Sequence, residues 1–221
     1  VPAMQASEDS PASGLSRLAK LLLSGAAQQG ITLRDPELTK LARYTELLEL
    51  WGRKINLTAV LGREQVVRRH FLDSLALVGR LPPASELPAP TLLDVGSGAG
   101  FPGVLCALCR PELRITLSER IGKKAAFLLT LRRELGLSFE VFAEDANRLP
   151  TGFGIVVSRA ALPLPKWFPF AEPLVAPKGF VYSMTSPGEP IPEPPSSLLL
   201  YLYERYDVGE GEHRILGHRK T

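Results

Sequence analysis

The chain has 221 residues, 45% of them hydrophobic, with a formal net charge of +3 and a pI near 9.0. This length and apolar content suffice for one α/β domain with an extension, so the fold should need no disulfide and no metal. No apolar run has the length of a membrane span, no signal-peptide pattern is present, and only two cysteines occur. We therefore exclude a membrane-embedded or exported protein and expect a cytoplasmic one whose small basic excess allows a polyanionic partner.

The first part of the chain predicts a leader and a helical extension. Residues 1–13 are rich in Ala, Ser and Pro without periodicity, which is typical of a disordered leader. Apolar residues at helical spacing follow from Leu15 to Gly30, and a second helix opens at Asp35-Pro36, an N-cap followed by proline. A third helix is expected from about Arg63 to Leu77. We assign residues 14–81 to this N-terminal helical extension.

After a proline-rich connection at residues 82–90, strand and helix patterns alternate. The predicted strands are Leu92–Val95, Arg114–Ser118, Phe139–Ala143, Ile155–Ser158 and Phe180–Met184. The predicted helices between them are Val104–Cys109, Lys123–Leu135 and Pro165–Leu174. Such alternation predicts a parallel sheet covered by helices on both faces.

The last segment of the chain changes character. Leu198–Tyr206, a turn at Gly209–Gly211 and His213–Leu216 are typical of an antiparallel hairpin. The predicted fold class over residues 91–221 is therefore α/β. It is a Rossmann-like, doubly wound, mostly parallel sheet with a C-terminal antiparallel hairpin, which is the architecture of the class I methyltransferases.

One apolar run, Leu92–Val95, contains the acid Asp94 and leads into the glycine-rich segment Gly96–Gly103. Glycine lets a ligand lie against the backbone and the following helix offers unpaired N–H groups, so the segment predicts a nucleotide-type binding loop. It contains both the G-x-G-x-x-G pattern of dinucleotide-binding proteins and the G-x-G-x-G pattern of methyltransferases that use S-adenosyl-L-methionine (AdoMet). Because Asp94 closes the strand just before Gly96, the first turn glycine is Gly96, which favours AdoMet.

Two acids are placed to serve this loop. Glu119, after the apolar run at 115–117, can accept hydrogen bonds from ribose hydroxyls, and both ligand classes require such an acid. Asp94 has two open interpretations. It contacts the amino group of the methionine part of AdoMet, or it caps the loop by accepting backbone N–H bonds.

Several motifs occur in order along the chain and together carry a resemblance. They are Trp51 with Asn56-Leu57-Thr58, then Arg69-His70 with Asp73-Ser74, then Asp94–Gly103, Gly122-Lys123-Lys124 and Ser158-Arg159-Ala160. In this set, from about Leu15 to Leu216, the chain closely resembles the bacterial RsmG (GidB) family, which methylates N7 of a guanine in 16S ribosomal RNA of the small subunit with AdoMet. The resemblance implies cofactor contacts at the positions of Gly96, Phe101, Ala146, Asn147 and Arg159.

The chain departs from the family pattern at three places. The usual Arg-x-Glu is Asp145-Ala146-Asn147 here, which puts side-chain contact with adenine in doubt. The usual Lys-Gly after the fifth strand is replaced around Thr185, so a basic contact to the substrate is lost. The proline-rich stretch Pro187–Pro195 has no assigned role.

Methyl transfer to guanine N7 needs no base, because N7 already carries an in-plane lone pair, so we expect a positioning site. The cofactor-binding residues predicted in full are Asp94, Gly96, Gly98, Gly100, Phe101, Glu119, Ala146, Asn147 and Arg159. Arg159, Asn56 and His70 are the candidates for contact with the reacting groups, although His70 has no proton to remove as a base. The alternative for Asn56, Thr58, His70, Asp73 and Ser74 is a structural role in caps and hydrogen bonds between the helices and the sheet.

Basic residues are candidates for contact with RNA phosphates at Arg68, Arg69, Lys123 and Lys124. Cys106 and Cys109 lack further ligands for zinc, so we expect core residues and no metal. Trp51 and Trp167 lie on apolar stripes and are also expected in the core. We expect a monomer whose partner is 16S ribosomal RNA or the small ribosomal subunit.

Two other functions stay open on the sequence alone. An oxidoreductase that binds a nicotinamide dinucleotide would satisfy the glycine pattern, but the chain lacks room for a second mononucleotide-binding half. A protein that binds AdoMet and RNA without turnover would be consistent with the departures at Asp145, Asn147 and Thr185.

Overall fold

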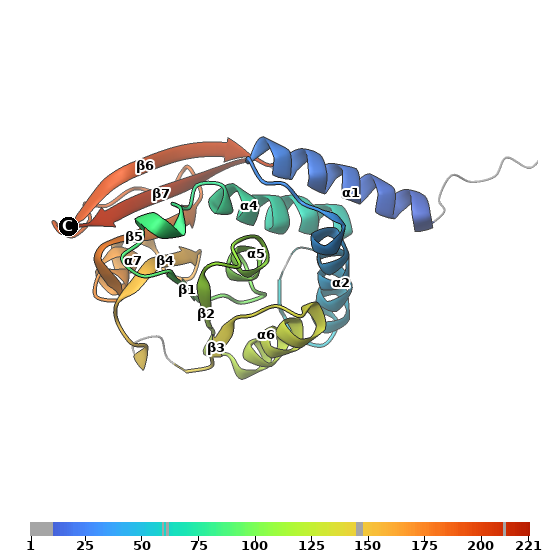
Figure 1. Cartoon of the computed structure of the whole chain (residues 1–221), viewed down its shortest axis with the longest axis horizontal. Helices are drawn as coiled ribbons and strands as arrows, with labels where there is room; N and C mark the ends of the chain where they lie inside the picture. Colours follow the sequence, from blue (N-terminus) through green and yellow to red (C-terminus); the bar gives the residue numbers. More distant parts are fainter. Residues whose placement is uncertain (1–10, 59, 61, 145–147, 210) are drawn as a thin grey trace, which may run out of the picture.

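The computed structural model describes residues 11–221 except 59, 61, 145–147 and 210. Within this part of the chain, seven strands form a single sheet in the order β3-β2-β1-β4-β5-β7-β6 (Figure 1). The strands are β1 Thr91–Val95, β2 Arg114–Ser118, β3 Glu140–Phe142, β4 Phe153–Arg159, β5 Val175–Thr185, β6 Leu198–Asp207 and β7 Glu212–Lys220. Strands β1 to β5 pair in parallel, and β7 is antiparallel to both β5 and β6. The predicted doubly wound sheet with a terminal hairpin is confirmed.

The helices form an N-terminal group and a group that alternates with the strands. The first group is α1 Pro11–Gln28, α2 Asp35–Gly52, α3 Arg63–Val66, η1 Val67–Leu72, α4 Asp73–Val78 and η2 Ala84–Glu86. The second is α5 Gly103–Cys109, α6 Gly122–Leu135 and α7 Leu164–Ala171. The described part of the chain contains no helix long and apolar enough to cross a lipid bilayer.

Several predicted boundaries need correction. Helix α1 starts at Pro11, so the last residues assigned to the leader are helical, while residues 1–10 lie outside the described residues. The predicted third helix is continuous but contains a π-helical turn, η1, between α3 and α4. Helix α7 ends at Ala171 rather than Leu174, and β7 continues to Lys220 because it pairs along its whole length with β6.

The two faces of the sheet pack into two separate cores because side chains alternate along a strand. Leu92 packs with the N-terminal helices, α5 and α6, whereas its neighbour Leu93 packs with α7 on the other face. The N-terminal extension therefore covers one face of the sheet. Its helix α2 runs beside α6, and α4 lies beside α5 (Figure 1).

The predicted core residues are found in these layers. Cys106 is fully buried and Cys109 half-buried on α5, and burial raises the pKa of both thiols, that of Cys109 to about 12. Trp167, on α7, is buried in the core that also contains Val175 and Val181 of β5, and Trp51 packs on Phe127 of α6 with ring centroids 5.5 Å apart. The core assignment is confirmed for Cys106 and Trp167, whereas Cys109 and Trp51 are partly buried and pack against the core.

Candidate active site

The glycine-rich loop connects β1 to α5 at the carboxyl end of the sheet. The backbone N–H groups of Gly96 and Ser97 donate to the carbonyl oxygen of Ser118, the last residue of β2, at 2.9 and 3.0 Å. Gly98 has a φ of 57°, and a Cβ built on it would meet no atom closer than the carbonyl oxygen of Gly96 at 3.8 Å. Gly98 therefore presents bare backbone to open space, which is the surface a ligand needs.

The neighbouring glycines of the loop have a different reason to be glycine. A Cβ on Gly96 would lie 2.5 Å from the Cβ of Ala161, and a Cβ on Gly100 would lie 2.6 Å from the Tyr44 hydroxyl. Both positions are closed by the protein itself. Gly96, Gly98 and Gly100 were all predicted to bind the cofactor. At Gly96 and Gly100, however, glycine is needed because a side chain would prevent the loop from packing against its neighbours.

Asp94, on β1, supports both of its predicted roles. Its Oδ2 accepts a hydrogen bond from the Gly103 N–H at 3.0 Å, which caps the loop at the start of α5. Its Oδ1 is buried and has no hydrogen-bond partner among the described residues. Burial raises the pKa of Asp94 to about 6. An unpaired buried carboxylate oxygen beside the loop is suited to an ammonium group.

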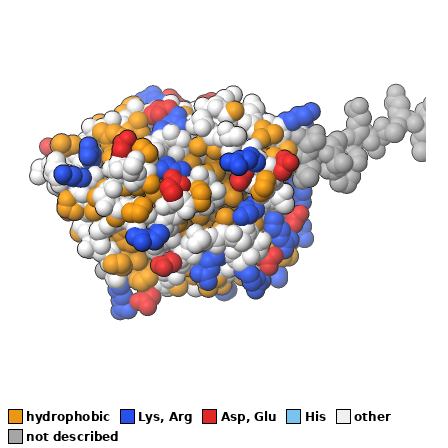
Figure 2. Space-filling view, viewed as in Figure 1, with side chains coloured by type: hydrophobic (Ala, Val, Ile, Leu, Met, Phe, Trp, Pro, Cys, Tyr) orange, Lys and Arg blue, Asp and Glu red, His pale blue; other side chains and the backbone are white. Residues whose placement is uncertain are grey.

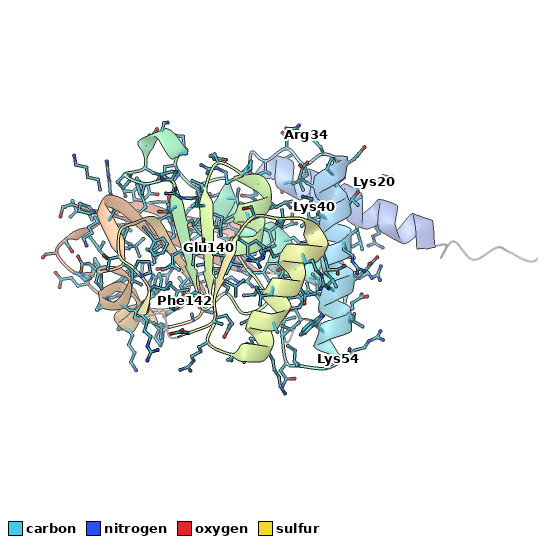
Figure 3. The ribbon with its side chains drawn as sticks, turned by 60° about the horizontal axis from the view of Figure 1, so that its bottom comes forward. Lys20, Arg34, Lys40, Lys54, Glu140 and Phe142 are labelled. Carbon is cyan, nitrogen blue, oxygen red and sulfur yellow. The ribbon has the colours of Figure 1, made fainter. Side chains whose placement is uncertain are left out.

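Glu119 lies directly after β2 and holds the loop from the other side. Its Oε2 accepts from the Gly98 N–H at 3.0 Å, and its Oε1 accepts from the Ile121 N–H at 2.7 Å. Its own N–H donates to the carbonyl oxygen of Phe142 on β3, a residue labelled in Figure 3. Each carboxylate oxygen keeps a second lone pair, so ribose hydroxyls remain possible partners.

Phe101 is buried in an aromatic stack rather than facing a ligand. Its ring lies between those of Tyr44 and His70, with centroids 5.1 and 4.6 Å away, and the Arg159 guanidinium lies 5.2 Å above it. Any cofactor contact at this position falls to the backbone. The predicted contacts at Ala146 and Asn147, with the departure at Asp145, lie outside the described residues.

Arg159 is the last residue of β4, which extends one residue beyond the predicted strand end at Ser158. Its Nη1 donates to Asp73 Oδ2 at 2.9 Å and to the carbonyl oxygen of Arg69 at 3.1 Å, and its Nη2 lies 3.2 Å from His70 Nδ1. Asp73 is buried, and its other oxygen accepts from the Tyr206 hydroxyl at 2.6 Å and lies 3.0 Å from His213 Nδ1. Arg159 is thus fixed by residues from η1 and α4.

His70 is buried beside Arg159, and both of its ring nitrogens already have partners. Its Nε2 lies 2.8 Å from the Thr58 hydroxyl, and its Nδ1 lies 3.0 Å from the carbonyl oxygen of Arg69. Burial, followed by the nearby Arg159, lowers the pKa of His70 to about 4. Ser74 donates to the carbonyl oxygen of His70 at 2.6 Å. These contacts favour the structural alternative for Thr58, His70 and Ser74.

Asn56 and Arg159 line different hollows of the described structure. Asn56 is exposed and lines a hollow of about 540 Å³ between the end of α2 and the start of α6. The hollow is lined by Gly52, Arg53, Lys54, Ile55, Asn56, Ile121, Lys123 and Lys124. Figure 2 shows Lys and Arg side chains gathered toward this part of the molecule, and Lys54 projects outward just beyond α2 in Figure 3.

The predicted RNA-binding residues therefore divide into two groups. Lys123 and Lys124 share the basic hollow with Arg53 and Lys54. Arg68 instead pairs with Glu64 at 3.0 Å and reaches the carbonyl oxygen of Val208, so its charge is used within the fold. Arg69 is exposed and lines a different cavity, beside Arg159.

That second cavity, of about 430 Å³, lies at the carboxyl ends of β4 and β5. Its walls are Val60, Arg69, His70, Asp73, Arg159, Ala160, Met184, Thr185, Ser186, Tyr206, Glu212 and His213. Tyr206 and His213 carry no functional signal in the sequence, because a hairpin pattern gives no sign of what its side chains face. The predicted order of the strands could have indicated these residues. A hairpin that pairs with the fifth strand brings its turn to the carboxyl edge of the sheet, where the site lies.

The residues that depart from the family pattern after β5 make hydrogen bonds within the fold. The Thr185 hydroxyl donates to the Glu189 carboxylate, whose other oxygen accepts from the Leu164 N–H at 3.0 Å. Buried Arg214 donates to the carbonyl oxygens of Pro187 and Glu189 at 3.4 and 2.7 Å. The start of the proline-rich stretch is therefore anchored to β7 and to the first residue of α7.

Comparison with known proteins gives a consistent result. Residues 37–189 match the family model described as GidB, rRNA small subunit methyltransferase G. The chain is 39% identical over 193 residues to the ribosomal RNA small subunit methyltransferase G of Halorhodospira halophila, covering 86% of this chain and 88% of that relative. It is 35% identical over 182 residues to that of Burkholderia ambifaria, covering 79% of this chain and 78% of the relative.

Solved structures share the fold at low sequence identity. Magnesium protoporphyrin IX methyltransferase (ChlM) from Synechocystis PCC 6803, with bound SAM, has a TM-score of 0.56 and 12% identity, covering 86% of this chain and 99% of that chain. TrmN from Thermus thermophilus has a TM-score of 0.54 and 18% identity, covering 73% and 55%. The fold is that of a class I methyltransferase, and the family match favours methyl transfer over the nicotinamide-dependent oxidoreductase considered above.

Proposed function

The chain belongs to the rRNA small subunit methyltransferase G family, and from this premise we propose that it transfers a methyl group from AdoMet to N7 of a guanine in 16S ribosomal RNA. The observation that carries the proposal is the pairing of two adjacent sites along one edge of the sheet. The open backbone at Gly98 and the unpaired Asp94 Oδ1 form one, and the polar cavity beside Arg159 forms the other.

The residues present fit AdoMet. Asp94 Oδ1 would accept from the amino group, the backbone at Gly98 would lie against the ligand, and Glu119 would accept from the ribose hydroxyls. When bound, the cofactor supplies an activated methyl group on a sulfonium. The protein itself then has to orient and enclose, because N7 needs no deprotonation.

Arg159 and its partners supply the orientation. Asp73 and the carbonyl oxygen of Arg69 fix the guanidinium over Phe101, which joins the glycine loop to the cavity. A rigid cation between the two sites can hold the methionine carboxylate or an RNA oxygen without changing its protonation state. The basic hollow with Lys123 and Lys124 would contact phosphates of the same RNA and set affinity rather than sequence choice. We also propose that the chain acts in the cytoplasm as a monomer.

The test is incubation with methyl-labelled AdoMet and small subunits from cells that lack this methylation, followed by chemical cleavage at N7-methylguanine. We expect label at one guanine of 16S ribosomal RNA, and none with a Gly98→Val variant. Parallel reactions with naked 16S ribosomal RNA identify the form of the substrate. Tight AdoMet binding by calorimetry with no transfer to either substrate would contradict the proposal and favour a binding protein without turnover.

A further inference from the structure

The cavity beside Arg159 is bounded by charged and aromatic side chains from several parts of the chain. Asp73 comes from α4, Arg159 from β4, Tyr206 from β6 and His213 from β7. With a volume of about 430 Å³ and Arg159 stacked over Phe101 of the glycine loop, it adjoins the proposed cofactor site. A flat polar base could enter it from RNA in which that base is unstacked.

Most polar groups on the cavity wall are already engaged. Both oxygens of Asp73, both ring nitrogens of His70 and the Thr185 hydroxyl have partners. His213 differs. Its Nδ1 lies 3.0 Å from Asp73 Oδ1 and its ring stacks on Tyr206 at 5.6 Å, but no hydrogen bond joins its Nε2 to any residue that the structure describes. Its side chain is 29% exposed, so Nε2 can reach a ligand.

We propose, on the basis of the function above, that this cavity holds the target guanine and that His213 donates a hydrogen bond from Nε2 to guanine O6. Methylation at N7 requires the Hoogsteen edge of the base to face the cofactor site. Guanine presents N7 and O6 on that edge, both acceptors, whereas adenine presents N7 and an amino donor. A donor placed beside N7 therefore accepts guanine and rejects adenine.

Asp73 makes His213 a donor. The Nδ1–H of His213 points to the carboxylate, so a neutral ring would leave a lone pair on Nε2, and only the protonated ring donates from both nitrogens. The hydrogen bond to Asp73 raises the pKa of His213 against the opposing effects of burial and of Arg159 on β4, and Asp207 on β6 adds to the rise. Tyr206 on β6 also faces the ring. Asp73 is thus a positioning residue that extends the donor form to higher pH.

The sign of the pH dependence follows. Because the folded-state pKa of His213 lies above its ordinary value of 6.5, the donor form is present below that raised pKa and is lost as pH rises through it. The rate of methylation of bound substrate should fall over the same range. A glutamine at this position offers an amide donor that does not titrate, so it separates hydrogen bonding from charge.

The experiment measures single-turnover methylation at saturating AdoMet from about pH 6 to 9. The substrates are small subunits assembled with 16S ribosomal RNA transcripts that carry guanine or adenine at the methylated position. We expect His213→Phe to lower the rate on guanine about tenfold or more. His213→Gln should stay within a few fold of the wild-type chain and lose the fall at high pH. Lys20→Gln, which removes a cation from α1, is the control for net charge and should match the wild-type chain.

The outcomes separate this inference from the proposed function. AdoMet affinity, measured by calorimetry, should be the same in all variants. Transfer by His213→Phe at the wild-type rate with the wild-type pH profile would overturn the role of His213 alone. No transfer by the wild-type chain would overturn the proposed function and this inference with it. If His213→Phe does not fold, an unchanged pH profile in His213→Gln decides against the inference.

Discussion

The two adjacent sites at the carboxyl edge of the sheet are built by opposite means. The site at β1 and β2 consists mainly of backbone. It contains Gly98 facing open space, N–H groups tied to Ser118, and two acids from the ends of their own strands. The site at β4 and β5 consists of side chains in which Arg159, Asp73 and His213 come from parts of the chain far apart in sequence.

This difference has a physical consequence. A backbone site is determined by local conformation, so it is damaged by adding atoms or by changing a local φ. A side-chain network depends on several elements at once, so it is damaged by removing one charged group and leaving its partner buried. The following variants test that distinction.

The largest effect is expected for Gly98→Val. A branched residue at a φ of 57° is strained, and its side chain would fill the space in which the ligand lies. We expect no measurable heat of AdoMet binding by calorimetry while circular dichroism retains the folded spectrum.

The matched control is Gly136→Val. Gly136 also has a φ of 57° and open space around its Cβ, but it ends α6. It should lose comparable stability, of order 1–3 kcal/mol, and bind AdoMet normally. Equal loss of binding in both variants would mean that Gly98 acts through the fold.

The second prediction concerns Arg159→Ala. The change removes a rigid cation and leaves the Asp73 carboxylate to Tyr206 and His213, so orientation at the site is lost. We expect single-turnover methylation at saturating AdoMet to fall roughly a hundredfold, with the whole pH profile lowered. Because the two residues act as a unit, Arg159→Ala with Asp73→Asn should cost much less than the sum of the single changes.

Arg110→Ala provides the comparison. Arg110 lies between α5 and the start of β2, at the opposite edge of the sheet. It pairs with Glu112 and donates to the carbonyl oxygen of Pro82, and its side chain is 14% exposed. Its loss should lower the melting temperature and leave turnover per folded molecule unchanged. If turnover fell as much in Arg110→Ala as in Arg159→Ala, the effect of Arg159→Ala would reflect the loss of a buried arginine from the packing and not a role at the site.

The backbone site could be predicted from the sequence because its signals are local. Asp94, the glycines and Glu119 all lie at strand ends that apolar runs mark, and β2 was predicted to the residue, Arg114–Ser118. The sequence did not reveal which glycines of the loop face a ligand and which face protein atoms. Gly96 and Gly100 face Ala161 and Tyr44, which are contacts that depend on how the chain packs.

The side-chain site could be predicted only in part. Arg159 and His70 were singled out through the family resemblance, but the contact of Arg159 with Asp73 depends on how η1 and α4 pack on the sheet. A π-helical turn leaves the apolar periodicity nearly unchanged, so the sequence pattern does not reveal it. His213 was missed because strand register, which sets what β7 faces, follows from pairing with β5.

The third prediction concerns Asp94→Asn. Its folded-state pKa of about 6 lies above the ordinary 3.8, so ionisation of the buried carboxyl opposes folding as pH rises through about 6. The asparagine variant should therefore melt no lower than the wild-type chain at neutral pH. It should still bind AdoMet about tenfold or more weakly, because a charged acceptor for the ammonium is lost.

Calorimetry against pH completes that test. Wild-type affinity should fall as pH drops below about 6, where Asp94 becomes protonated, and the affinity of the variant should not show this fall. A pH-independent wild-type affinity would assign Asp94 to capping alone.

The smallest effect is expected for His70→Gln, which tests whether base chemistry occurs in the side-chain site. Both ring nitrogens of His70 are engaged, and burial holds its pKa at about 4, so the ring is neutral throughout the working range. Glutamine can keep the hydrogen bond to Thr58, so we expect a rate within a few fold of the wild-type chain and a pH profile of the same shape. Single-turnover methylation against pH at saturating AdoMet measures both, since weakened cofactor binding cannot then imitate slow chemistry. If the profile instead loses an inflection on its acidic limb while Arg159→Ala stays near normal, the site removes a proton through His70, and positioning by Arg159 is wrong.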